Sequence, residues 1–135
     1  MPASPFTITN LMEVDDSVAG RAAGVEGRFG RSHMDSEHLG VSHFRYAPNV
    51  RSPMAHSHRE QEEVYVVVGG SGRVRLDDEV RPVGMWDVIR VSPTTVRAFE
   101  AADDGLEFLA IGSDRPEGGD GVPAEQAWVQ EAAGD

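Results

Sequence analysis

The feature that most constrains the fold is a series of short, β-rich runs between residues 41 and 112. Gly, Pro or Asp separates neighbouring runs, and no stretch between them is long enough for the helix that links parallel strands. The runs read VSHFRYA, EEVYVVV, GRVRL, DVIRV, TVRAFEA and LEFLAIG. Within GRVRL, apolar and basic residues alternate, as in a strand with one buried face. The pattern predicts an all-β antiparallel sandwich or barrel.

Three polar or glycine-rich segments between the runs are predicted to be turns. Asp77-Asp78 separates GRVRL from EVRPV, which is typical of a tight hairpin, and Asp103-Asp104-Gly105 is typical of a second one. The GGSG segment at 69–72 precedes a strand rather than a helix. It is therefore predicted to be a β-turn and not a phosphate-binding loop.

The length of 135 residues favours one domain. We expect an N-terminal arm over residues 1–40, a core over 41–112 and a C-terminal tail over 113–135, packed on or beside the domain. The piece from Asn10 to Ala23 is a candidate for a short helix capped by Asn10, although Gly20 and Gly24 interrupt it. The tail has a short amphipathic piece, AEQAWVQEA, anchored by its tryptophan.

Composition narrows the classes of partner. Twelve basic residues against 23 acidic ones give a net charge of −11, which argues against nucleic acid and membrane partners. Cysteine is absent, so disulfides and thiolate metal ligands are excluded. The N-terminal residues resemble no signal peptide, and a cytoplasmic location is expected. A metal ion or a small ligand is the favoured partner.

The segment AHSHREQEEVYVVVGGSG has the pattern of a metal site. Residues two apart on a strand point to the same side, so His56 and His58 project together. One turn of the chain would bring Glu63 opposite them. Two histidines and one carboxylate hold non-haem iron and leave coordination positions open, and Zn, Mn, Ni and Co use similar ligands. An isolated His-x-His pair, by contrast, is usually a pair of surface histidines.

The same segment resembles the first motif of the cupin superfamily: Gly, five residues, His-x-His, three or four residues, Glu, six residues, Gly. The matching residues are His56, His58, Glu63 and Gly70. Glu62 with Gly69 fits the three-residue variant, but Glu63 is preferred because it directly precedes the Val-Tyr run. Val50 stands where the motif has its first Gly.

The segment WDVIRVSPTTVRAFE resembles the second cupin motif less closely. Trp86 stands at the place of a Gly, Ala101 at that of an Asn, and Arg97 at that of the fourth ligand, a histidine. The resemblance covers about residues 41–112. It implies an antiparallel jelly-roll barrel like the small single-domain bacterial cupins of unassigned activity, and a homodimer.

Arg97 leaves two functional hypotheses open, because arginine stays protonated and cannot bind a metal. In the first, His56, His58 and Glu63 bind a divalent Fe, Mn, Ni or Zn ion and Arg97 binds a small organic anion. The protein would then be an enzyme of dioxygenase, isomerase or lyase type. In the second, an Arg97–Glu63 ion pair replaces the metal in a non-catalytic binding or sensing barrel.

Other residues are placed by their spacing. Tyr65 follows Glu63 by two and Phe99 follows Arg97 by two, so both are expected to face inward, and Tyr65 is a candidate for proton transfer. His43 is expected on the outer face, Gln61 in a loop, and both tryptophans in hydrophobic clusters.

Overall fold

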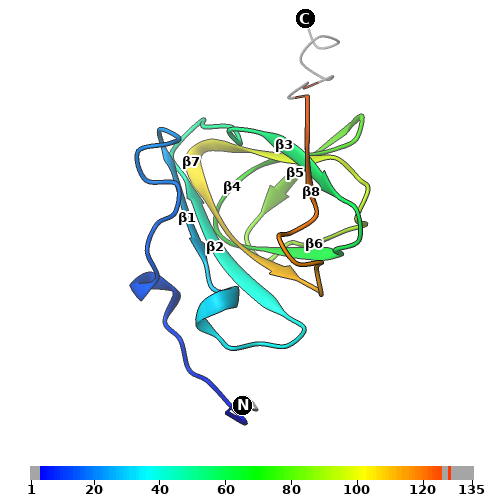
Figure 1. Ribbon diagram of the computed structural model, residues 1–135. Coiled ribbons are helices and arrows are strands. Elements are labelled where there is room, and N and C mark those ends of the chain that lie inside the picture. The colour runs from blue at the N-terminus through cyan, green and yellow to red at the C-terminus, as the bar shows by residue number, and fades with distance from the viewer. Residues whose placement is uncertain (1–3, 126–127, 129–135) are drawn as a thin grey trace, which may run out of the picture.

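The computed structural model describes residues 4–125 and Trp128, and its strands curl around a common interior (Figure 1). The strands are β1 (Val25–Phe29), β2 (Gly40–Tyr46), β3 (Ala55–His58), β4 (Glu63–Leu76), β5 (Glu79–Gly84), β6 (Val88–Val91), β7 (Arg97–Gly112) and β8 (Gly121–Ala124). Their order is β1-β2-β7-β3-β8, and β4 pairs with β5, β6 and β7. Every one of these pairings is antiparallel, so the all-β antiparallel prediction is confirmed.

Strands β4 and β7 each join two of the predicted runs. They pair along both halves of their length, with register shifts near residues 67–72. The GGSG segment and the segment 103–105 therefore lie inside these strands, and predicting them as turns was wrong. Gly70 and Gly105 have φ angles of +68° and +77°, and a side chain on Gly70 would collide with the Gly105 carbonyl. Glycine thus lets the two strands bend together as they pass around the barrel.

The hairpin predicted at Asp77-Asp78 is confirmed, since it joins β4 to β5. Asp77 adopts a left-handed φ of +54°, and its side chain accepts a hydrogen bond of 2.8 Å from the Val96 amide. Aspartate tolerates this backbone conformation better than most residues, and the hydrogen bond stabilises it.

Segments on both sides of residues 41–112 take part in the sheet. Within residues 1–40, β1 pairs with β2, and within residues 113–135, β8 pairs with β3, so the sheet extends beyond residues 41–112 at both ends. The helix predicted from Asn10 to Ala23 is wrong in extent. Asn10 caps only a 3-10 helix, Leu11–Glu13. The glycines at 20 and 24 have positive φ angles, which are incompatible with a continuing helix.

The two tryptophans differ. Trp128 is buried against Ala55 and Ala98, as expected of an anchor, but most of the predicted amphipathic piece lies outside the described residues. Trp86 is 71% exposed, so placing it in a hydrophobic cluster was wrong. It occupies the turn between β5 and β6 with a φ of +71°, at the position where the cupin motif has Gly.

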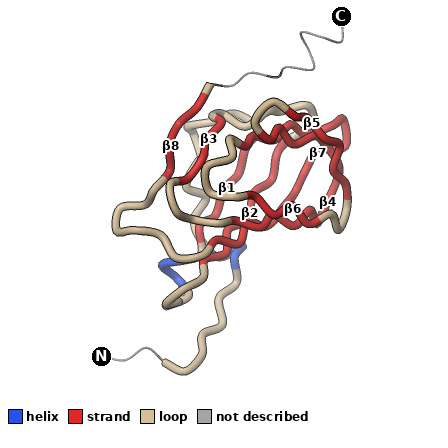
Figure 2. The backbone as a smooth tube through the Cα atoms, turned by 90° about the vertical axis from the view of Figure 1, so that its right-hand side faces the viewer, coloured by secondary structure: helices blue, strands red, loops and turns tan. Residues whose placement is uncertain are grey.

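The core is a cluster of buried apolar side chains inside the barrel. Figure 2 shows the barrel backbone from the side, with the N-terminal segment extending away from it. The aromatic residues of the core pack ring against ring from Phe44 through Phe108 to Phe99 and Tyr65. Among the described residues no helix has the length and apolar character needed to cross a membrane. The strands that carry this core also place the polar residues described next.

Candidate metal centre

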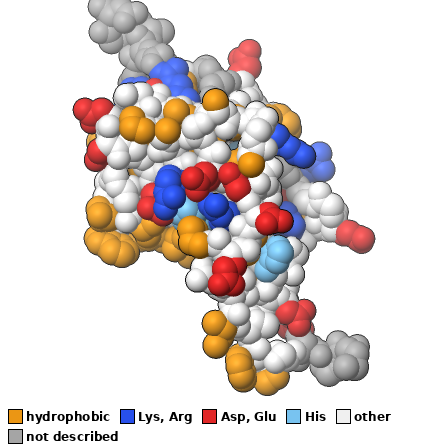
Figure 3. All heavy atoms as spheres, turned by 90° about the vertical axis from the view of Figure 1, so that its left-hand side faces the viewer, with side chains coloured by type: hydrophobic (Ala, Val, Ile, Leu, Met, Phe, Trp, Pro, Cys, Tyr) orange, Lys and Arg blue, Asp and Glu red, His pale blue; other side chains and the backbone are white. Residues whose placement is uncertain are grey.

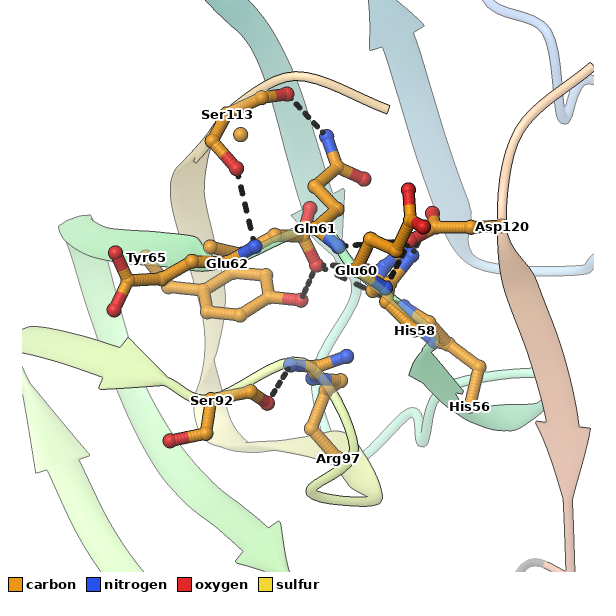
Figure 4. A network of polar contacts seen from close by, with 12 residues as sticks. His56, His58, Glu60, Gln61, Glu62, Tyr65, Ser92, Arg97, Ser113 and Asp120 are labelled. Carbon is orange, nitrogen blue, oxygen red and sulfur yellow. Dashed lines mark hydrogen bonds and ion pairs between the residues drawn. The ribbon is translucent and has the colours of Figure 1, made fainter. Parts of the chain in front are cut away.

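The two histidines and the carboxylate predicted from the sequence meet in space. Figure 4 shows the two histidines beside Asp120 and Tyr65. His56 and His58 lie on β3, and Glu63 begins β4 after a four-residue connection. The Glu63 Oε1 atom lies 3.0 Å from His58 Nε2 and 3.9 Å from His56 Nε2. The expectation that one turn of the chain brings Glu63 opposite the histidines agrees with this geometry. Glu62 instead points to the surface, where it pairs with Arg90.

The three side chains fit a metal ion. Each offers a ligand atom, and these atoms lie within 4.8 Å of one another. Two ligand atoms bound about 2.1 Å from one ion lie roughly 3.0–3.4 Å apart at octahedral or tetrahedral angles. The Glu63–His58 distance falls in that range, and the Glu63–His56 distance is slightly longer. His56, His58 and Glu63 therefore form a cluster able to hold a metal ion.

Asp120 orients one of these histidines, and sequence reasoning missed it. Its Oδ1 lies 2.8 Å from His58 Nδ1, while its Oδ2 accepts backbone hydrogen bonds from Glu60 and Gln61. The Asp120 carboxylate favours a proton on His58 Nδ1. In the neutral histidine this tautomer leaves the Nε2 lone pair, on the side of Glu63, available to a metal ion. Asp120 lies beyond both motifs, in the predicted tail, where no spacing rule points to it.

The polar contacts shift the pKa values of this cluster. Burial alone would raise the pKa of Glu63, but the nearby His56 and the hydrogen bonds from His58 and Tyr65 outweigh it, and the net shift is downward. Burial lowers the pKa of His58, yet its bonds to Glu63 and Asp120 make the net shift upward. In this state Glu63 is therefore a carboxylate, and its hydrogen bond with His58 favours the protonated form of that histidine. A metal ion binding there would displace a proton.

Tyr65 faces inward, as predicted, and lines the cavity. Its hydroxyl donates a hydrogen bond of 2.6 Å to Glu63 Oε1. Burial raises the pKa of Tyr65 well above its usual value, and the neighbouring charge of Glu63 adds to this. The hydroxyl thus keeps its proton and acts as a donor to the carboxylate.

Arg97 is buried beside the cluster without pairing with it. It begins β7 opposite His56, and its side chain is fully shielded from solvent. Its Nη2 donates to the Ser92 carbonyl at 3.0 Å, whereas Nε and Nη1 have no hydrogen-bond partner among the described residues. The structure describes both Arg97 and Glu63 and records no ion pair between them. The ion pair of the second hypothesis is therefore not formed.

These residues line a cavity of about 300 Å³ in the barrel interior. Phe99 faces inward as predicted and lines the cavity, and Gln61 lines it as well. Gln61 is only 6% exposed and donates its amide to the Ser113 carbonyl, so it is a buried residue of the connection between β3 and β4. The cavity combines the candidate metal cluster with a buried, unpaired arginine.

His43 faces away from this cavity, as expected, but it is only 3% exposed. Its Nε2 lies 2.6 Å from Glu107 Oε2. It belongs to a set of charged and polar side chains on the outer face of β1, β2 and β7, which we call the outer ladder. Charged side chains gather on the molecular face shown in Figure 3. The outer ladder comprises Glu26, Arg28, His43, Arg45 and Glu107.

Comparison with known proteins gives a family match. The family profile described as the cupin domain matches residues 42–112, which is more than half of the chain and contains both motifs. No curated protein sequence matches the chain.

Solved structures with the same fold share little sequence. A cupin protein from Bacteroides fragilis is 20% identical, covering 85% of this chain and 89% of its own, with a TM-score of 0.68. The polyketide cyclase RemF from Streptomyces resistomycificus is 17% identical, covering 94% and 92%, with a TM-score of 0.70. Oxalate decarboxylase from Bacillus subtilis is 22% identical over 87% of this chain but only 32% of its own, with a TM-score of 0.71. At these identities the likeness shows the fold alone.

Proposed function

The chain belongs to the cupin family, and we propose that it binds a divalent transition metal and a small organic anion side by side in its barrel. His56, His58 and Glu63 hold the metal, and Arg97 binds the anion. The reaction on that anion is of dioxygenase, isomerase or lyase type. The metal is iron, manganese, nickel or zinc, all of which accept imidazole and carboxylate ligands.

One observation carries this proposal: Arg97 is buried in the same cavity as the cluster, yet two of its nitrogens have no partner in the described chain. An unpaired guanidinium that is shielded from water is costly, because neither water nor a carboxylate compensates its charge. An anionic ligand supplies that compensation. This favours the enzyme over the barrel closed by an ion pair, since Arg97 does not pair with Glu63.

The metal would supply Lewis-acid or redox chemistry to a ligand at its open coordination positions. The residues of the chain do the rest. Arg97 orients the anion through charge-assisted hydrogen bonds. Tyr65 donates to Glu63 and keeps that carboxylate oriented, and it is the candidate for moving a proton at its hydroxyl oxygen. The aromatic walls exclude water, which strengthens these electrostatic interactions.

The proposal is tested by elemental analysis of untagged protein purified without chelator. We expect about one transition-metal ion per chain in the wild-type protein and its loss in His56→Ala. Glu62→Gln is the matched control, because Glu62 is adjacent in sequence but pairs with Arg90 at the surface. It should keep the metal.

A metal-containing protein would then be screened with small carboxylates and β-dicarbonyls, with and without oxygen. Turnover that disappears in His56→Ala supports the enzyme. A wild-type protein that binds none of the four ions after reconstitution contradicts the metal site. Metal binding without turnover of any compound would leave a binding barrel. The homodimer expected from the family stays a prediction.

A further inference from the structure

The cavity is positively charged although the protein as a whole is acidic. Three arginines line it, Arg31, Arg97 and Arg115, and Glu63 is the one acidic residue among the described lining residues. The complete chain, by contrast, has a net charge of −11. A positive cavity in an acidic protein favours anions over neutral ligands, and charge focusing in a low-dielectric cleft increases that preference.

The three arginines are not equivalent. Arg31 donates its Nη2 to the backbone carbonyls of Gly112 and Ser113, which occupies it within the fold. Arg115 is exposed, so water and salt screen its charge. Arg97 alone among them is fully buried with unpartnered nitrogens, and Figure 4 shows its guanidinium directed toward the space beside the histidines and Tyr65. Of the three arginines, Arg97 is therefore the one that most needs an anionic partner.

The walls away from Arg97 are apolar and aromatic. The rings of Phe44 and Phe108 stack at 5.3 Å, and those of Phe108 and Phe99 stack at 4.4 Å. Ala110 also lines the cavity, on the same face of β7 as Phe108, and its side chain is small. Such walls desolvate an apolar group and favour a flat ring. They offer few hydrogen bonds to a ligand rich in hydroxyl or carboxylate groups.

We propose that the ligand of this cavity is a monocarboxylate with a compact, ring-shaped apolar body. The carboxylate lies against Arg97, and the ring lies against the phenylalanine walls. At about 300 Å³ the cavity is at the small end of ligand pockets, which limits the body to about one ring. The inference rests on the proposed function for a metal beside the carboxylate. The contacts with Arg97 and the rings require no metal.

Calorimetric titration tests the inference with three probes: benzoate, its neutral analogue benzamide, and malonate, which has two carboxylates and no ring. Each is titrated into metal-free and metal-reconstituted protein whose metal content is measured on the same sample. We expect benzoate to bind about tenfold or more tightly than benzamide, because only benzoate satisfies Arg97. Malonate should bind more weakly than benzoate, because it has no ring to bury.

Two variants separate the two halves of the site. Arg97→Gln should weaken benzoate about 10- to 100-fold and leave benzamide nearly unchanged, since it removes the charge-assisted bonds. Ala110→Leu fills the space before the rings and should abolish binding of both ring compounds while metal binding persists. Arg115→Gln is the matched arginine control and should change benzoate binding less than threefold, on the order expected of a screened charge.

The outcomes distinguish this inference from the proposed function. Benzoate binding to protein that takes up no metal supports the ligand assignment and contradicts the metal site. A metal-loaded protein that binds malonate more tightly than benzoate overturns the ligand assignment and leaves the metal site standing. Equal binding of benzoate and benzamide also overturns it. Should Arg97→Gln fail to fold, the comparison of benzoate with benzamide and the Ala110→Leu variant still decide the question.

Discussion

Carboxylates on the two faces of the barrel wall are neutralised in different ways. On the outer ladder, Glu107 contacts His43 at 2.6 Å and Arg45 at 3.1 Å, and Glu26 contacts Arg28 at 2.8 Å. Inside, Glu63 accepts hydrogen bonds from His58 and Tyr65, while Arg97 lies in the same cavity without pairing with it.

This difference distinguishes charged side chains that stabilise the fold from charged side chains that are available to bind a ligand. Each carboxylate of the outer ladder contacts an arginine of the same ladder. The negative charges of the ladder are therefore compensated once the strands pair. In the cavity, two histidines, a carboxylate and an arginine converge, and the arginine keeps unpartnered nitrogens. Polar groups arranged in this way stabilise the fold little by themselves and are suited to binding a metal and an anion.

Replacing the residue that orients the inner site should have the largest effect. Asp120→Asn removes the carboxylate that holds the His58 tautomer, and we expect metal affinity to fall about 10- to 100-fold. Competition with a coloured chelator measures this affinity. Glu107→Gln, which changes an outer carboxylate, should leave it unchanged. An Asp120→Asn variant with wild-type affinity would show that Asp120 supports the fold and not the metal site.

Removing an outer carboxylate should affect stability. Glu107→Gln should lower the free energy of unfolding by about 1–2 kcal/mol at neutral pH, because the buried His43 loses its carboxylate partner and Arg45 keeps only its longer contact with Glu26. Metal content should stay the same. Chemical denaturation of the metal-free proteins measures the difference. Loss of metal in this variant would contradict the separation of the two faces.

The stability effect of Glu107→Gln should depend on pH. Burial opposes the shift, but the hydrogen bond with His43 and the charge of Arg45 lower the pKa of Glu107 below its usual value of 4.5. A lowered pKa stabilises the folded state above the ordinary value, and this contribution is lost as pH falls through the folded-state pKa. The melting curves of wild type and variant should therefore converge under acidic conditions. A constant difference down to strong acid would contradict the assignment.

The smallest effect on stability is expected for Glu62, which is adjacent to Glu63 in sequence but lies outside the cluster. Glu62 forms an exposed ion pair with Arg90, with side chains 53% and 63% exposed. Glu62→Gln should change the free energy of unfolding by less than about 0.5 kcal/mol, because exposed pairs contribute little. Denaturant titration checks this value. A large loss of metal in this variant would mean that the three-residue spacing of the motif is the one used.

Local patterns were sufficient for much of this protein. Alternation along the short runs predicted the antiparallel sheet, and the spacing of His56, His58 and Glu63 predicted the cluster. Each of these depends on residues within one strand or one connection, where backbone geometry sets the direction of side chains. Local composition also led to the wrong prediction of a turn at residues 103–105. Residues that form turns also suit a bulge in a long paired strand.

The amino-acid sequence by itself therefore determined the fold class and the three side chains of the cluster that could hold a metal ion, because periodicity and short spacings are local properties. Only the tertiary structure brought Asp120 from the C-terminal segment to His58. The sequence also allowed an ion pair between Arg97 and Glu63. Only the tertiary structure showed that Arg97 instead donates to the Ser92 carbonyl and leaves two nitrogens without a partner among the described residues. Both outcomes depend on how distant strands pack, and contacts between distant segments have no fixed spacing along the chain.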